Sequence, residues 1–414
     1  MLPFSELGIT KNLLRCVELA GYDKPTEIQE KSIPVILKGQ DLIAQAKTGS
    51  GKTISFVLPI LQLFEDSRDS KRRILKVLIL TPTRELAMQV QGVLKVFGRN
   101  LPDPLRTILL IGGLNIDLQI RYLHHGADIA VATPGRLLDI VKRKEIRLSS
   151  VNLLVIDEAD KMLDMGFKEE LEEVLKVLPA RRQNVLLSAT MDEEIVSMTQ
   201  RFMHDPVQIK IAEEIPTVET IHQRAIEVNR TNRGPLLRHL IKTEGWEQVL
   251  VFVASVRGAD ILASKLRSAG ILADELHGGL TQAQRTFVLN AFKTKAIKVL
   301  VATDIIARGI DIDQLPFVLN YDLPRSPNEY IHRVGRTARA GMKGVAVSFI
   351  GHEDKDHFKL IEKRIQVRLT RESVKGFELT GEAPVQEKGK APLKGHRMSK
   401  KDKARALAKK ESNE

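Results

Sequence analysis

Three acids follow an apolar run in the first half of the chain, and their spacing suits phosphate chemistry. Leu153 to Ile156 are apolar, and Asp157, Glu158 and Asp160 come directly after them. An apolar run of this length that meets a charge cluster is typical of a buried parallel strand that ends at a site. Acids at the carboxyl end of such a strand can hold a divalent cation and orient a water molecule.

A glycine-rich sequence upstream could bind the phosphates. Residues 46–53 read AKTGSGKT. Gly49 and Gly51 allow backbone N–H groups to turn toward phosphate oxygens, and the start of the next helix adds positive potential. Lys52 can reach the β- and γ-phosphates, and the Thr53 hydroxyl can contact Mg²⁺.

The phosphate loop and the acid cluster together indicate a nucleoside-triphosphate hydrolase. We expect Asp157 to hold Mg²⁺, directly or through water, and Glu158 to deprotonate the attacking water. Further on, residues 332–339 place three arginines within seven positions. Arginines that reach a γ-phosphate from another domain stabilise transition-state charge, although an ordinary basic helix could show the same spacing.

Short strand-like runs alternate with helical stretches such as 53–64 and 84–98. The expected strands are 41–45, 77–81, 107–111, 129–133, 153–157 and 184–188 in the first half, and 248–253, 273–276, 298–302, 317–320 and 345–350 in the second. This alternation predicts an α/β fold, with parallel sheets covered by helices on both faces. Only the first half has a phosphate loop, which suggests two related halves that share one nucleotide site.

Composition shifts predict the domain boundaries. We expect a first domain at 1–210, a linker at 211–218, a second domain at 219–370 and a basic tail at 371–414. Between 382 and 414, eight lysines and two arginines face four glutamates and one aspartate, a balance of +5. We expect this tail to be disordered and to tether RNA electrostatically, the alternative being a solvated end without a specific role.

The bulk composition suggests a polyanionic partner, either nucleic acid or an anionic surface, the alternative being that the charge serves solubility alone. The 414 residues carry a net charge of +12, and aromatic residues make up only 4%, so stacking cannot be the main route to ligand binding. The chain has one cysteine, Cys16, which predicts no internal disulfide and fits a reducing compartment. Residues 1–10 lack a signal-peptide pattern and no membrane-length apolar run occurs, so the predicted location is cytoplasmic.

The order of these motifs resembles that of the DEAD-box RNA helicases of superfamily 2. The resemblance covers residues 4–370 and implies two tandem RecA-like domains, ATP and Mg²⁺ as ligands, and RNA as partner. The matching segments are Phe4, Gly21, Tyr22, 24–26, Ile28, Gln29, 46–53, 82–87, 112–113, 133–136, 157–160, 188–190, 251–255, Gln282, Arg285, 303–304, 308–309, Asp311 and 332–339.

The resemblance also assigns roles to single residues. It places the catalytic groups at Lys52, Glu158, His332, Arg336 and Arg339, with the last two as arginine fingers. It places the metal at Thr53 and Asp157. The nucleotide-binding residues it implies are Phe4, Tyr22, Thr26, Gln29, Thr48, Gly49, Ser50, Gly51, Lys52, Thr53 and Asp311. The RNA-binding residues it implies are Arg84, Gly112, Gly113, Thr133, Arg136, Ser255, Arg285 and Thr303.

Gln29 has a physical reason to select adenine. Its amide can pair with both the N6 donor and the N7 acceptor of adenine, whereas guanine presents an acceptor, O6, in place of N6. Two departures from the family pattern are small: Ala338 replaces the commoner glycine, and Ser255 replaces the usual threonine.

Three functions remain open on the sequence. The leading one is an RNA-dependent ATPase that separates short duplexes locally. The second is an enzyme that clamps or remodels ribonucleoproteins with little unwinding, and the third is an RNA-binding protein with an inactive nucleotide site, which intact Lys52 and Glu158 disfavour. A DNA helicase fits less well. Within the family, the chain is most like bacterial, RhlE-like helicases that assist ribosome assembly, so pre-ribosomal particles are possible partners.

Overall fold

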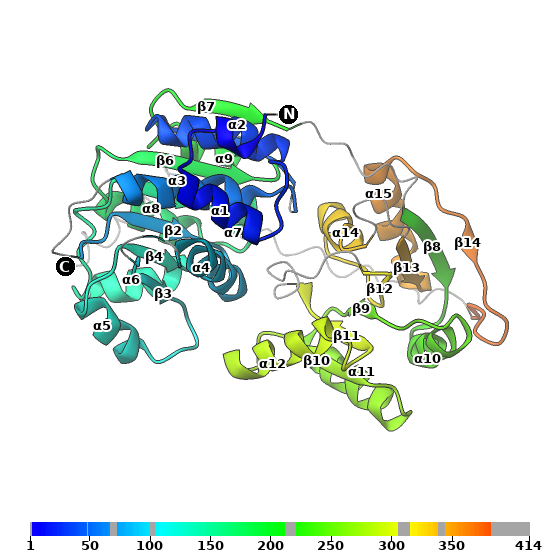
Figure 1. Cartoon of the computed structure of the whole chain (residues 1–414). Helices are drawn as coiled ribbons and strands as arrows, with labels where there is room; N and C mark the ends of the chain where they lie inside the picture. The colour runs from blue at the N-terminus through cyan, green and yellow to red at the C-terminus, as the bar shows by residue number, and fades with distance from the viewer. Residues whose placement is uncertain are drawn as a thin grey trace, which may run out of the picture.

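Two α/β halves follow one another along the chain (Figure 1). The computed structural model describes residues 2–47, 49–66, 73–99, 101, 104–211, 221–304, 315–337 and 344–381. Within them, each half is built on a seven-stranded sheet, and neighbouring strands pair in parallel throughout, as in β2 with β5 and β9 with β12. This confirms the predicted fold class. None of the described helices is long and apolar enough to cross a membrane.

The first sheet lies between two layers of helices. Its strands, in spatial order, are β3 (Thr107–Leu110), β4 (Ile129–Ala132), β2 (Val77–Leu80), β5 (Leu153–Ile156), β6 (Gln183–Ser188), β1 (Leu42–Gln45) and β7 (Val207–Lys210). The helical segments of this half are η1 (Phe4–Glu6), α1 (Lys11–Leu19), α2 (Glu27–Leu37), α3 (Lys52–Asp66), α4 (Arg84–Gly98), α5 (Ile116–His124), α6 (Pro134–Lys142), α7 (Ala159–Asp164), α8 (Lys168–Val177) and α9 (Glu193–Thr199).

The second sheet repeats the arrangement of the first. Its spatial order is β10 (Ala273–Leu276), β11 (Val299–Ala302), β9 (Val249–Phe252), β12 (Phe317–Asn320), β13 (Gly344–Ile350), β8 (Ile221–Glu227) and β14 (Arg371–Glu372). The helical segments of this half are η2 (Arg230–Asn232), α10 (Arg233–Thr243), α11 (Val256–Ser268), α12 (Gln282–Lys293), α14 (Pro327–Val334), η3 (His352–Asp354) and α15 (Lys355–Ile365).

Numbered within its own half, each sheet has the strand order 3-4-2-5-6-1-7. The two halves therefore share one topology, as the strand–helix alternation suggested. Every strand predicted from an apolar run is present. Three strands were missed: β7 and β14, at the edges of their sheets, and β8, which lies between β13 and β14. Their side chains are mostly polar and only partly buried, so they lack the apolar run that marks a strand buried on both faces.

Central strands are apolar because helices cover both of their faces. The runs VLIL in β2, LLVI in β5 and VLVF in β9 are buried along their whole length. Separate clusters of buried apolar side chains lie on the two faces of the first sheet, one containing Val77 and Val155 and the other Leu78 and Leu154. Burying one such side chain contributes about 1.5–3 kcal/mol, which makes the sheet a rigid base for the loops at its edge.

The chain after α15 differs from the sequence analysis. Residues 371–381 were assigned to the tail, but Arg371–Glu372 forms β14 beside β8, and Val374 and Phe377 pack on the core of the second half. This segment therefore belongs to the fold of the second half. The other domain boundaries remain a prediction. Most of the predicted linker, and the tail from 382 to 414, lie outside the described residues.

Equivalent helices start in the same way in the two halves. Thr83 caps α4 by accepting a hydrogen bond at Oγ1 from Leu86 N (3.3 Å), and Ser255 caps α11 by accepting one at Oγ from Gly258 N (3.1 Å). Both caps satisfy N–H groups that the helix itself leaves unpaired. They lie just past the carboxyl ends of β2 and β9, the edge at which open α/β sheets bind ligands.

Candidate nucleotide and RNA site

The phosphate loop joins β1 to α3 and depends on two glycines. Gly49 and Gly51 have φ values of 83° and 94°, a backbone region that favours glycine. A Cβ atom on Gly51 would lie 2.4 Å from Nε2 of Gln29, so a side chain is excluded there by contact as well. Lys52 is buried, and its Nζ donates to the carbonyl oxygen of Ala46 (2.6 Å), which holds the lysine across the loop.

Gln29 connects α2 to the phosphate loop. Its Nε2 donates to Gly51 O (3.1 Å), and its Oε1 accepts from Thr26 N (3.0 Å) as part of the capping box of α2. An amide has two N–H groups and two lone pairs on oxygen, so one of each remains to pair with an adenine edge. Gln29 therefore joins the start of α2 to the backbone of the phosphate loop.

Other residues predicted to bind the nucleotide vary in exposure. Phe4 is buried in the apolar core of the first half, whereas Tyr22 is 41% exposed and packs against Phe97 with ring centroids 6.1 Å apart. Ser50 has a buried hydroxyl with no hydrogen-bond partner among the described residues, and Thr53 is half-buried in the first turn of α3.

The two acids that follow β5 are buried, and burial disfavours the charged form of a carboxyl group. Asp157 and Glu158 are 4% and 3% exposed. Burial, then the charge of Glu158, raise the pKa of Asp157 to about 7, although Lys52 and Lys161 act in the opposite direction. Asp157 Oδ1 is buried without a hydrogen-bond partner among the described residues. Glu158 has left-handed backbone angles (φ 53°, ψ 53°), a strain of order 1–3 kcal/mol that is common at functional sites.

Lys161 completes this cluster, and the sequence analysis gave it no role. Its Nζ donates to Glu158 Oε1 (2.8 Å), and both side chains are buried. Burial lowers the Lys161 pKa and Glu158 raises it, while the positive charge of Arg336 lowers it further. Arg336 belongs to the second half, so its charge reaches the acid cluster of the first. The spacing of Lys161, three residues after Glu158 at a helix start, could have indicated this pair.

Asp160 links the acid cluster to residues 188–190. Its Oδ2 accepts from Ala189 N (3.0 Å) and Thr190 N (3.1 Å), and its backbone N–H donates to Ser188 Oγ (3.3 Å). Hydrogen bonds to a carboxylate are among the stronger ones in proteins. Movement at the start of α7 would therefore be carried to the segment after β6.

Arginines gather where the two halves meet. A Cβ on Gly112 or Gly113 would lie 3.0 Å or 2.1 Å from the guanidinium of Arg84, so these glycines make room for it. Burial, then the charge of Arg285, lower the pKa of Arg84, while Glu85 raises it and Arg136 lowers it by a smaller amount. An arginine stays protonated under such shifts, so this cluster is a strongly positive site suited to phosphate groups.

Glu85 connects the two halves at the same place. Its Oε1 accepts from Gln282 Nε2 (3.3 Å) and from Arg285 Nη1 (3.3 Å), and all three side chains are buried. Arg285 also donates to Gly278 O (2.9 Å). The sequence analysis assigned Arg285 to RNA alone and gave Glu85 no role, because partners about two hundred positions apart leave no local signal.

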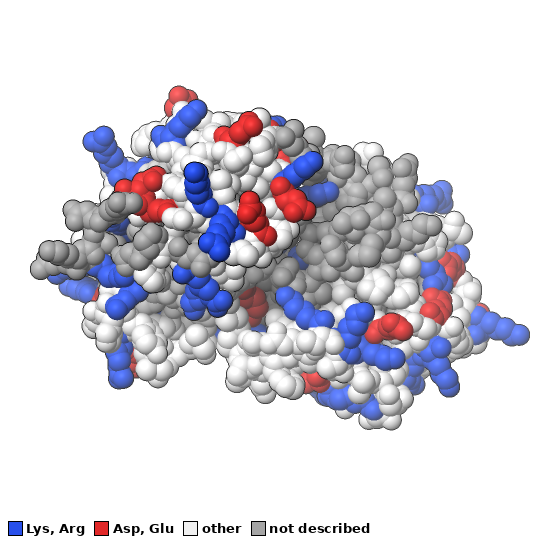
Figure 2. Space-filling view, viewed as in Figure 1, with Lys and Arg blue, Asp and Glu red and all other residues white. Residues whose placement is uncertain are grey.

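On the face shown in Figure 2, lysine and arginine side chains are spread over both halves with acidic side chains between them. The net charge therefore does not mark one binding surface on this face. The arginine cluster beside Gly112 and Gly113 is the more specific indication of an anion site.

The remaining predicted RNA contacts lie near the carboxyl ends of strands. Thr133 follows β4 and is largely buried, Thr303 follows β11 and is half-buried, and Ser255 lies past β9 and is exposed. Arg136, in α6, donates from Nη1 to Leu114 O (3.0 Å), the residue after the Gly112–Gly113 pair. All of them occupy the ligand-binding edges of their sheets.

Arg333 fixes the last motif to the second sheet. Its Nε and Nη2 donate to Oδ1 and Oδ2 of Asp304 (2.5 and 2.7 Å), and its Nη1 donates to Asn320 Oδ1 (2.9 Å). This bidentate pair sets the position of α14, which carries half-buried His332 and leads to buried Arg336. Three predicted site residues, Thr48, Asp311 and Arg339, lie outside the described residues.

Comparisons with known proteins agree with this geometry. The family model "DEAD/DEAH box helicase" matches residues 26–198, and "Helicase conserved C-terminal domain" matches residues 233–341. The ATP-dependent RNA helicase CshA of Listeria monocytogenes is 41% identical over 369 residues, which are 89% of this chain and 70% of that protein. A CshA of Bacillus cereus is 41% identical over 371 residues, 90% of this chain and 70% of that protein.

Solved structures show the same two-domain arrangement. Dbp5 of S. cerevisiae, bound to RNA and ADP BeF3, has a TM-score of 0.77 at 30% identity and covers 90% of this chain and 95% of its own. Mss116p, bound to ssRNA and AMP-PNP, has a TM-score of 0.80 at 26% identity and covers 90% of this chain and 78% of its own. The chain belongs to the DEAD-box family, and it is an ATP-dependent RNA helicase built from two tandem RecA-like domains.

Proposed function

We propose that hydrolysis of ATP takes place between the phosphate loop and the acids after β5, with Glu158 as the general base. Lys52 holds the β- and γ-phosphates, and Glu158 takes a proton from the attacking water. The observation that carries this assignment is the buried pair of Glu158 and Lys161, with the charge of Arg336 close by from the second half. Arg336 and Arg339 then stabilise charge on the γ-phosphate, with His332 beside them.

Asp157 and Thr53 are proposed to hold Mg²⁺. The fit rests on Asp157, because its Oδ1 atom is buried without a partner among the described residues and its pKa is raised to about 7 by burial. A buried acid of this kind is stabilised by a nearby cation. When bound, the ion neutralises charge on the ATP phosphates.

Gln29 is proposed to read adenine with the amide N–H and the lone pair that its protein contacts leave over. Gln29 also donates to Gly51 O in the phosphate loop. A base that pairs correctly with Gln29 therefore also fixes the position of this carbonyl, so the identity of the base and the position of the phosphates are coupled. Tyr22, Phe4 and Asp311 complete the proposed nucleoside contacts.

RNA is proposed to bind across both halves through its backbone. Arg84, Arg136 and Arg285 supply positive charge, and their mutual repulsion makes phosphate groups favoured neighbours. Backbone contacts are largely independent of sequence, and ribose 2′-hydroxyls can make them specific for RNA. The other proposed RNA contacts are Gly112, Gly113, Thr133, Ser255 and Thr303.

Closure of the two halves is proposed to couple the two ligands. ATP and RNA each contact both halves, so each favours the arrangement in which Glu85 meets Gln282 and Arg285. A strand bound across both halves is bent, which separates a short duplex locally. Hydrolysis and phosphate release then reopen the halves.

The cellular substrate is proposed to be a structured RNA or an RNA–protein particle, such as a pre-ribosomal particle, in the cytoplasm. The support is the overall charge of +12 and the basic segment 382–414. Crosslinking of RNA to the protein in cells, followed by sequencing, tests this. Ribosomal RNA should dominate, and a distribution that follows RNA abundance would contradict a ribosomal role.

The biochemical proposal is tested by comparing two variants with the wild type. Arg336→Ala should bind RNA normally yet lose RNA-stimulated hydrolysis, because Arg336 acts only on the γ-phosphate. Arg136→Ala should instead raise the RNA concentration needed for half-maximal hydrolysis, with little change at saturation. Separation of a short RNA duplex, with a longer duplex and a DNA duplex as controls, should fail in both variants at low RNA. If Arg336→Ala weakened RNA binding and Arg136→Ala lowered hydrolysis at saturating RNA, the roles proposed for these two arginines would be wrong.

A further inference from the structure

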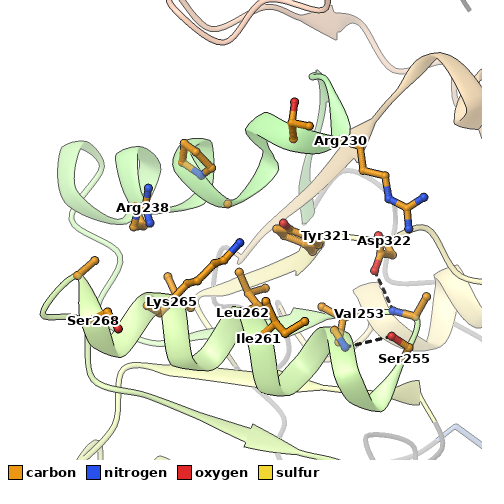
Figure 3. Close-up of a pocket in the computed structure, with 17 residues that line it drawn as sticks. Arg230, Arg238, Val253, Ser255, Ile261, Leu262, Lys265, Ser268, Tyr321 and Asp322 are labelled. Atoms are coloured by element: carbon orange, nitrogen blue, oxygen red, sulfur yellow. Dashed lines mark hydrogen bonds between the residues drawn. The ribbon is translucent and has the colours of Figure 1, made fainter.

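A cavity of about 610 Å³ opens in the second half between α10 and α11 (Figure 3). Apolar side chains, among them Leu262 and Val253, and the half-buried Tyr321 line it. Lys265 extends from α11 toward α10 in Figure 3, while Arg230 lies at the other end of the groove. This cavity is separate from the phosphate loop, and the proposed hydrolysis does not use it. One residue at its end, Ser255, is a proposed RNA contact, whereas Ile261, Lys265 and Ala269 have no role in the proposed function.

The first half shows what occupies the corresponding place there. Because the topologies match, α3 and α4 are the counterparts of α10 and α11. Helix α1 packs against both α3 and α4, and its apolar stripe of Leu13, Cys16 and Val17 is buried among them. Thr10 N, just before α1, donates to Gln62 Oε1 of α3 (2.7 Å). Among the described residues, no helix covers α10 and α11 in this way.

Residue changes at equivalent positions keep the second groove open. Val93 and Phe97 of α4 lie nine and thirteen positions after Arg84, and both pack in the core. The same steps from Val256 lead to Lys265 and Ala269, which line the cavity and are exposed. A charged side chain and a methyl group thus replace two core residues, and Ile261, also in the lining, is left 45% exposed.

The charges of the groove select an acidic ligand. Arg230, Arg238 and Lys265 line it, and none of them forms an ion pair with any residue that the structure describes. The one acid in the lining, Asp322, is already paired with Arg233 (3.0 Å). Three unpaired cations around an apolar floor therefore favour a partner that carries both acidic and apolar groups.

A protein helix fits these features better than RNA does. Tyr321 is the only aromatic residue in the lining, and its ring is half-buried against Phe349, with centroids 6.0 Å apart. A base therefore has no exposed aromatic face on which to stack, the usual platform for single-stranded RNA. An apolar groove between two helices matches the stripe of an amphipathic helix, as α1 illustrates in the first half.

We propose that the groove between α10 and α11 is a docking site for a short amphipathic helix of a partner protein, with an apolar stripe flanked by acidic side chains. The inference does not rest on the proposed function. The partner helix takes the place that α1 has in the first half. Its stripe covers Ile261 and Leu262, and its acids pair with Arg238 and Lys265.

The test uses α1 as the template for a probe. The probe is a labelled peptide of residues 9–20 held helical by a side-chain lactam bridge, with Lys11→Glu, Arg15→Glu and Cys16→Ala. Lys11 and Arg15 are exposed in α1, so these changes leave the stripe intact apart from Cys16. The charge control is the same bridged peptide with Lys11 and Arg15 retained. Fluorescence anisotropy with the full-length protein should show the acidic peptide binding at least tenfold more tightly.

Variants of the protein locate the binding. The double variant Arg238→Glu, Lys265→Glu should reverse the preference, so that the basic peptide binds better. Ala269→Phe restores the residue type of the first half, fills the groove and should abolish binding of both peptides. Lys242→Glu, on α10 but outside the groove, should change nothing. RNA-stimulated ATPase activity of each variant should match the wild type, which shows that it is folded.

Several outcomes would overturn the proposal. They are failure of the acidic peptide to bind, equal binding of the two peptides, and binding that survives Ala269→Phe. A further control measures the affinity of each variant for single-stranded poly-uridine RNA. If the charge reversals weaken RNA binding and leave peptide binding unchanged, the groove belongs to the RNA path and not to a protein partner.

Discussion

The two halves share one strand order, yet they treat equivalent positions in opposite ways. Lys52 is the first residue of α3, and Arg233 is the first residue of α10, its topological counterpart. Glu158 is the second residue after β5, and Asp322 is the second after β12. Both halves therefore place a cation at a helix start and an acid after the fifth strand.

The difference lies in what these groups bind. Arg233 donates to Oδ1 of Asp322 (3.0 Å) and to Tyr321 O (3.0 Å), and it also pairs with Asp354. In the first half, Lys52 donates to a backbone carbonyl of its own loop, and Asp157 Oδ1 has no partner among the described residues. The second half pairs its helix-start cation with the acid after its fifth strand, whereas in the first half Glu158 pairs with Lys161 (2.8 Å) and Lys52 is left to the phosphate loop. The first half thus differs in that the lysine at the helix start does not pair with the acid after the fifth strand, so both groups can act on a ligand.

The largest expected effect comes from removing the base of the first half. Glu158→Gln should bind ATP and RNA but hydrolyse about 10²–10⁴-fold more slowly, or roughly 3–5 kcal/mol in the barrier, because an amide cannot accept the proton. Single-turnover hydrolysis with saturating RNA measures this. The matched control is Asp322→Asn at the equivalent position of the second half, which should hydrolyse at nearly the normal rate. Near-normal turnover of Glu158→Gln would remove this residue from its role.

Removing Arg233, the cation that pairs with Asp322 and Asp354, should lower the free energy of unfolding and leave the rate of hydrolysis unchanged. Arg233→Met leaves Asp322 and Asp354 without their shared cation. Loss of one partner of a buried pair typically costs 3–5 kcal/mol, and partial exposure of the two acids reduces this to roughly 2–4 kcal/mol here. Urea unfolding of the full chain measures it, with exposed Arg230→Met as the control. An unchanged free energy of unfolding would show that the pair does not stabilise the second half.

Gln29→Ala should relax the choice of nucleotide. The lost amide contact with adenine should reduce the preference for ATP over GTP by about 1–3 kcal/mol. Because Gln29 also holds Gly51 O and caps α2, affinity for both nucleotides should fall as well. Michaelis constants for ATP and GTP measure the two effects separately. A variant that keeps the full preference for ATP would show that other groups read the base.

The smallest expected effect is a gain of stability when the buried carboxyl of Asp157 is replaced by an amide. Burial raises the pKa of Asp157 to about 7, above its value of about 4 in the unfolded chain, so folding favours the neutral carboxyl. The stability of the wild type should therefore fall as the pH rises from about 4 through 7, whereas Asp157→Asn escapes this loss. Without divalent cations, the stability advantage of the variant over the wild type should be larger at pH 8 than at pH 5. Thermal unfolding at both pH values tests this, and a constant difference would contradict it.

Motifs and central strands could be predicted from the sequence because their signals are local. The runs that became β2, β5 and β9 are apolar since helices cover both faces, and the phosphate loop needs glycine at positions with positive φ. Strands β7 and β8 mix polar with apolar residues, so they carry no such continuous run, and they were missed.

The amino-acid sequence was thus sufficient for the chemistry, the α/β class and the order of the motifs. Contacts between distant segments needed the folded chain: Gln29 on Gly51, Asp160 on residues 188–190, Glu85 on Arg285, and Arg333 on Asp304. The folded chain was also needed to show that Asp322 is paired with Arg233, whereas the cations that line the same groove are not paired with any residue that the structure describes. The sequence gives the type of each side chain. Which charged side chains meet depends on packing between segments far apart along the chain, so an acid of the same type can either form an internal ion pair or bind a ligand.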